Sequence, residues 1–199
     1  MSPPRGQAEG WAIMLSDEAT EFLLRELFQA PEDNVYAILD GASIPQLAEL
    51  PLGLPGDFVC LFPGELGEAL ARAAPYLVRL DREAPITRTL IAEGFGAHWG
   101  VFARSPLQIE FLQIHLRGLF QVYGPAPDHA PLFFRYYDPR VLRAYVKICT
   151  ADELRALFGP IRCFLLEGEP PNCLLRIAAG QGVANIDTIP LPGAPGGTP

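Results

Sequence analysis

Short apolar runs that alternate with segments of helical spacing constrain the fold of this chain most strongly. "VYAILD" at 35–40 is one such run, and "ELGEALARAAP" at 65–75 has helical spacing. Such alternation is typical of β-α-β units, in which helices cover both faces of a parallel sheet. We expect strands at 35–40, 57–63, 76–81, 98–105 and 131–137, and helices at 17–29, 43–51, 65–75, 84–96, 106–124, 139–149 and 151–159. The sequence therefore predicts an α/β fold with a mostly parallel central sheet and helices on both of its faces.

The chain ends in a different pattern, which sets the expected domain limits. Two apolar runs, 161–168 and 173–180, flank "EPPN" and predict an antiparallel hairpin at the C-terminal end of the sheet. The chain has 199 residues, enough for one sizeable domain. We expect a flexible lead over 1–16, a single α/β domain over 17–187, and a disordered Pro/Gly-rich tail over 188–199.

Composition excludes several classes of partner. The net charge is -8 and lysine occurs once, whereas nucleic-acid binders usually carry a basic face. No uninterrupted apolar stretch approaches the roughly 20 residues that a membrane span needs, and the N-terminus has no signal-peptide pattern. The four cysteines form no CxxC pair, which argues against a zinc site and is typical of a reducing compartment. We therefore expect a cytoplasmic protein without nucleic-acid binding or membrane insertion.

Three aspartates, Asp40, Asp81 and Asp138, directly follow expected strands. Ligands bind at the carboxyl ends of parallel strands, so these carboxylates could converge on a divalent metal or share acid–base work. The same residue type also ends strands and caps helices for purely structural reasons. The chain shows no phosphate-binding loop, no histidine or cysteine metal spacing, and no nucleophile with a partner nearby in sequence. We predict no catalytic residues, no metal and no cofactor.

The stretch "LFFRYYDPRVLRAY" at 132–145 concentrates polar groups where a strand is expected to meet a helix. Asp138 is placed to cap that helix. Alternation along strand 131–137 predicts that Arg135 and Tyr137 point away from the core. Two interpretations stay open: an arginine–aspartate brace for the corner, or an arginine- and tyrosine-rich binding surface. The candidate partner-binding residues are Arg135, Tyr137, Asp138, Arg140 and Arg143.

Six segments occur in a distinctive order: "YAILDGA", "PYLVRLD", "WGVFARSP", "LQIEFLQIHLRGLFQV", "FFRYYDPRVLRAY" and "LFGPIRCFLLE". Together they resemble the adaptor, or effector-chaperone, domain of bacterial type VI secretion systems (the Tap/TEC family), over about residues 34–168. Members of that family are cytoplasmic and non-enzymatic. They bind a toxic effector and help to load it onto the spike protein VgrG. The resemblance therefore implies an effector protein and VgrG as partners.

These observations lead to three functional hypotheses. The first is a non-catalytic adaptor that shields an apolar segment of an effector and docks it to the spike. The alternative is a metal-dependent hydrolase or phosphotransferase that uses Asp40, Asp81 and Asp138. A third is a purely structural subunit of the secretion apparatus.

Overall fold

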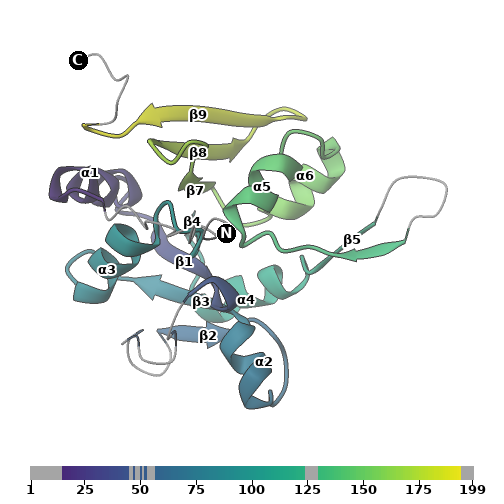
Figure 1. Ribbon diagram of the computed structural model, residues 1–199. Coiled ribbons are helices and arrows are strands. Elements are labelled where there is room, and N and C mark those ends of the chain that lie inside the picture. Colours follow the sequence, from purple (N-terminus) through teal and green to yellow (C-terminus); the bar gives the residue numbers. More distant parts are fainter. Residues whose placement is uncertain are drawn as a thin grey trace, which may run out of the picture.

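The computed structural model describes residues 15–44, 47, 50, 52, 57–123 and 130–193 (Figure 1). Its strands are β1 (Asn34–Asp40), β2 (Phe58–Cys60), β3 (Pro75–Leu80), β4 (Gly100–Ser105), β5 (Gln121–Tyr123), β6 (Pro131–Phe133), β7 (Cys163–Glu167), β8 (Cys173–Ala179) and β9 (Ala184–Pro190). Seven of these strands form one sheet in the order β2-β3-β1-β4-β7-β8-β9. The other two, β5 and β6, form a separate hairpin.

The helices follow the expected apolar periodicity, with shifted ends. They are α1 (Asp17–Leu27), α2 (Glu68–Ala73), α3 (Pro85–Gly94), α4 (Ile109–Arg117), α5 (Pro139–Tyr145) and α6 (Ala151–Phe158), with a 3-10 turn η1 (Gly41–Ser43). The helix expected at 106–124 is shorter than predicted, since β4 continues through Ser105 and β5 begins at Gln121. The helix expected at 43–51 falls largely outside the described residues.

The prediction of a mostly parallel sheet is wrong. Every hydrogen-bonded pair in the seven-stranded sheet is antiparallel. Strands β3 and β4 do run in the same direction, since each is antiparallel to β1, and α3 connects them as in a β-α-β unit. However, β1 lies between them, so the two parallel strands never pair. The alternation of strand and helix in the sequence indicated the connection from β3 through α3 to β4. It did not indicate that β1 lies between these two strands in the sheet.

Helices cover both faces of the sheet, and β1 shows why the strands read as continuous apolar runs. Val35, Ala37 and Leu39 pack in a cluster with residues of α1 and α3. Tyr36 and Ile38 point the other way, into a cluster that contains residues of α4, α5 and α6. A strand buried on both faces needs apolar side chains at successive positions, whatever the direction of its neighbours. The protein is therefore an α/β domain with three layers.

The C-terminal part of the sheet extends beyond its expected limit. Strands β7 and β8 form the antiparallel hairpin across "EPPN". Strand β9 then pairs with β8 as far as Pro190, so residues 188–190, which we assigned to the tail, belong to the sheet. At the other end, Leu15 packs against the core and Ser16 caps α1, so these two residues, which we assigned to the lead, belong to the domain. Residues 1–14 and 194–199 lie outside the described part. None of the helices described is both long enough and apolar enough to cross a membrane.

Candidate functional site

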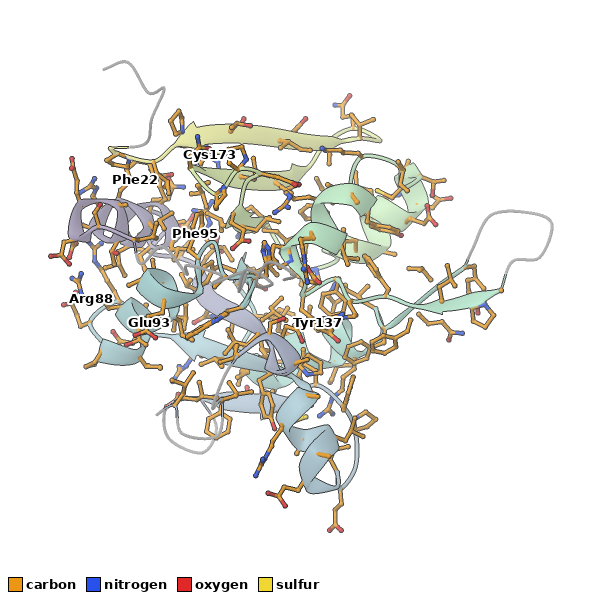
Figure 2. The ribbon with its side chains drawn as sticks, viewed as in Figure 1. Phe22, Arg88, Glu93, Phe95, Tyr137 and Cys173 are labelled. Carbon is orange, nitrogen blue, oxygen red and sulfur yellow. The ribbon has the colours of Figure 1, made fainter. Side chains whose placement is uncertain are left out.

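The stretch at 132–145 passes from the β5–β6 hairpin into α5, and its strand ends earlier than expected. Strand β6 ends at Phe133, and a turn follows before the helix, in which the Asp138 N–H donates to the Arg135 carbonyl at 2.9 Å. Asp138 caps α5, with its Oδ1 accepting a hydrogen bond of 2.9 Å from the backbone N–H of Arg140. Tyr137, labelled in Figure 2, lies where the chain enters the helix. The predicted helix cap is confirmed.

Asp138 is also the acceptor of a two-point ion pair. The Arg140 guanidinium donates from Nε to Oδ1 at 2.9 Å and from Nη2 to Oδ2 at 2.8 Å. The Arg135 guanidinium lies 3.8 Å from the same Oδ2. Burial opposes ionisation of Asp138, but the hydrogen bonds and charges of the two arginines outweigh it and hold its pKa below the usual value. The carboxylate is therefore ionised at neutral pH and fixed by its partners.

Arg135 joins this corner to the sheet. Its guanidinium donates to Oδ2 of Asp40, the last residue of β1, which is buried. Asp40 also accepts hydrogen bonds from the Ala42 backbone N–H at 3.2 Å and the Ser43 hydroxyl at 2.9 Å. The arginine thus lies between two buried carboxylates, and Asp40 is 95 residues away from it along the chain. This is the geometry of a structural brace.

Three of the five predicted partner-binding residues, Tyr137, Asp138 and Arg143, are buried. Tyr137 is 3% exposed, and burial raises the pKa of its hydroxyl. The Arg143 side chain is also buried and donates to the Glu167 carbonyl at 3.0 Å and to the Glu169 carboxylate at 3.1 Å. The outward direction predicted for Tyr137 is wrong because the chain has already left the extended strand. Arg135 and Arg140 remain 40% and 51% exposed at the side chain.

The three aspartates of the alternative hypothesis do not converge. Asp40 pairs with Pro75, at the start of β3, whereas Asp81 follows the far end of that strand. The two carboxylates therefore lie at opposite ends of the strand pair, about 20 Å apart at the usual rise per residue. Across the described ranges, no group of three or more histidine, cysteine, aspartate or glutamate residues could hold a metal ion. Antiparallel pairing thus overturns the three-aspartate site.

Glu167 is the buried carboxylate that the sequence analysis missed. It ends β7, which runs in the same direction as β1 because both strands pair antiparallel with β4. Its side chain accepts a hydrogen bond from the Gly96 backbone N–H and contacts the Nδ1 atom of His98, whose φ of 61° is unusual for a non-glycine residue. An apolar run that ends in one acid, "CFLLE", is the same signal that drew attention to Asp40 in "YAILD".

An aromatic stack beside the brace connects the core to the surface. Tyr136 is fully buried, and its ring lies 5.7 Å from that of Phe120. Phe120 in turn stacks on Phe133, with ring centroids 5.4 Å apart and planes 11° from parallel. Phe62 meets both phenylalanines edge-on. Phe133 is 58% exposed, so the stack ends in an open aromatic ring.

The hairpin that carries Phe133 exposes apolar side chains on both faces. It extends away from the sheet in Figure 1. Tyr123 and Phe133 lie on one face of the two-stranded ribbon, and Leu132 lies on the other. All three are exposed large apolar residues. We call Tyr123, Leu132 and Phe133 the hairpin surface.

The fold and this site define an α/β domain with an antiparallel sheet, a projecting apolar hairpin, and an arginine–carboxylate network at the base of that hairpin. A family model described as "Domain of unknown function (DUF4123)" matches residues 35–156, and the chain belongs to this family. The match begins in β1 and ends within α6, so it includes the hairpin surface and the brace. Comparisons with curated proteins and with solved structures gave no match.

Proposed function

We propose that this protein is a type VI secretion adaptor, which binds a toxic effector without catalysis and helps to load it onto the spike protein VgrG. The hairpin surface is the observation that carries this proposal. Exposed apolar groups gathered on one projecting element are typical of protein-binding sites. The sequence resemblance described above supplies the kind of partner, and membership of the DUF4123 family is compatible with it.

The chemistry of the hairpin surface suits an apolar segment of an effector. Aromatic residues and arginine are the residue types that contribute most to binding at protein interfaces. Phe133 is already stacked on Phe120, so little side-chain freedom remains to be lost when a partner covers it. Arg135 and Arg140 follow the hairpin closely in the chain. Their half-exposed guanidinium groups would form part of a polar rim around the hairpin surface.

The brace and the binding surface are then two parts of one site. Arg135 links Asp40 and Asp138, and this network holds the segment that follows Phe133. Tyr137, Asp138 and Arg143 would act indirectly, by fixing the base of the hairpin, because they are buried. We therefore assign direct contact to the hairpin surface and the two half-exposed arginines.

The mechanism we propose is chaperoning by selective binding. A protein that binds only one state of its partner raises the population of that state by mass action. The adaptor would cover an apolar segment of the effector in the cytoplasm, keep the effector competent for export, and release it at the spike.

Native co-purification tests this function. The full chain, carrying an affinity tag, is produced together with a candidate effector encoded beside it and with VgrG. We expect both proteins to be retained by the chain, and an unrelated effector to be lost on washing. A second assay follows effector secretion after the gene is deleted and then restored. Absence of binding to both proteins, or undiminished secretion after the deletion, would contradict the proposal.

A further inference from the structure

Strand β9 leaves one edge of the seven-stranded sheet open. It is the last strand in the sheet order, and among the described residues it pairs only with β8 (Figure 1). Most of its residues are exposed, so no other element in the described ranges covers it. Open strand edges promote association with other chains, and proteins usually protect them with charges, proline or bulges. On β9 the only proline is Pro190, at its very end, and the only charged residue is Asp187.

The hydrogen-bond pattern shows which backbone groups face outward. The β8–β9 ladder is flanked by a bond from Leu191 N–H to the Asn172 carbonyl and one from Gly180 N–H to the Val183 carbonyl, both 2.9 Å long. Bonding to the neighbour alternates along an antiparallel strand, so odd-numbered residues of β9 bond to β8. Ala184, Ile186 and Thr188 therefore direct their N–H and C=O groups away from the sheet.

We propose that this edge pairs with β9 of a second copy of the chain. The two strands would run antiparallel about a two-fold axis through Ile186, as in other isologous dimers. In this register Ile186 meets Ile186 of the second copy, and Ala184 meets Thr188. Every outward N–H on each copy then finds an outward carbonyl on the other. Pro190, which has no N–H, and the turn at Gly182 mark the two ends of the seam.

Charge and the turn before β9 favour this register over the two that are shifted by one residue at the axis. An axis through Asp187 would place two aspartates directly opposite each other, and like charges in that position are destabilising. An axis through Asn185 would place Thr188 opposite the turn, where Gly182 N–H already bonds to the Gly180 carbonyl. With the axis through Ile186, Asp187 faces Asn185 and keeps its 3.0 Å ion pair with Arg176. The strand is therefore complementary to itself in one register.

Side-chain packing supports the same arrangement. Ile186 is 38% exposed and lies opposite the buried Ile177 of β8, on the face of the sheet that carries α6. In the dimer, two copies of Ile186 would meet across the seam and extend that apolar row. Each copy carries a net charge of -8, so salt should strengthen the association by screening their repulsion. The inference does not depend on the adaptor function, and β9 lies outside the matched family region.

Sedimentation equilibrium of the full chain tests the dimer, from low micromolar to near-millimolar concentration at low and high salt. We expect reversible dimerisation that strengthens with salt. Thr188→Pro removes an outward N–H and should weaken dimerisation at least about tenfold, whereas Thr188→Ser keeps the N–H and should dimerise normally. Ile186→Lys keeps every N–H but places two like charges at the axis, and it should also weaken dimerisation.

Amide hydrogen exchange locates the seam and checks the variants. In the wild-type chain, Ala184, Ile186 and Thr188 should gain protection as concentration rises. Protected amides at Asn185 and Asp187 in Thr188→Pro would show that β9 still pairs with β8. Three results would overturn the proposal: a monomer under all conditions, a dimer unaffected by both substitutions, or protection of these amides that appears only when a different protein is added.

Discussion

Removing the Asp138 carboxylate should destabilise the whole domain, because this side chain both caps α5 and anchors the brace. Asp138→Ala deletes the cap bond to the Arg140 backbone and both bonds to its guanidinium. Loss of an N-cap typically costs about 1 kcal/mol. The ion pair adds up to about 1 kcal/mol, since Arg140 is half exposed and solvent weakens its charge. We expect the free energy of unfolding to fall by about 2 kcal/mol.

Urea unfolding at neutral pH, followed by far-ultraviolet circular dichroism, measures this loss. Asp152→Ala is the matched control, because Asp152 also pairs with an arginine in the first turn of a helix but is 85% exposed. The control should lose no more than about 0.5 kcal/mol. Asp138→Asn keeps the cap acceptor and should fall between the two. Equal losses for the two alanine variants would refute the reasoning that the buried carboxylate braces the corner.

The loss of stability in Asp138→Ala should depend on pH. The pKa of Asp138 is lower in the folded protein than its value of about 3.9 in an unfolded chain. A lowered folded pKa stabilises the protein above the unfolded value, and that stabilisation is lost as pH falls through the folded pKa. The difference between wild type and Asp138→Ala should therefore be constant from neutral pH to about pH 5. It should then shrink below about pH 4.

Three further substitutions test neighbouring parts of the account. Arg135→Ala leaves Asp40 buried without its cation, and we expect chemical denaturation to show a loss of about 2–3 kcal/mol, with Arg135→Lys partly restoring stability. Gly41→Ala would place a methyl group 2.6 Å from a backbone carbonyl of α2, so the thermal unfolding midpoint should fall, corresponding to about 1–3 kcal/mol. Thr150→Ala removes the capping box with Glu153 at the start of α6 and should cost about 1 kcal/mol by urea unfolding.

Local patterns in the sequence predicted most elements of the fold, except strands β5 and β9, but not the direction of their pairing. The apolar periodicity of each helix and strand depends on the few residues within it, so most elements were predictable. Direction is different, because a strand such as β1 is buried on both faces beside parallel or antiparallel neighbours alike. The insertion of β1 between β3 and β4 depends on contacts between distant segments, which a single sequence does not display.

In the candidate site, too, contacts between residues close in sequence were predictable, and contacts between distant segments were not. The Asp138 cap and its pairing with Arg140 involve residues two positions apart, and their types made that geometry predictable. The bond between Arg135 and Asp40 joins β1 to the segment before α5, so only the fold reveals it. The outward orientation of Tyr137 was inferred by assuming that a strand continued to that residue. The strand ends at Phe133 instead, and this change buries Tyr137 and leaves Phe133 open.

The central claim is that the hairpin surface binds the effector, and a calorimetric titration of the candidate effector with the purified full chain tests it most directly. Phe133→Ser removes the exposed end of the aromatic stack, whereas Ile148→Ser removes an apolar side chain that is 81% exposed outside the site. We predict that Phe133→Ser weakens binding by about 2 kcal/mol or more, roughly thirtyfold, and that Ile148→Ser binds as the wild type does. Equal affinities for the wild type and Phe133→Ser, with both chains folded, would contradict the claim.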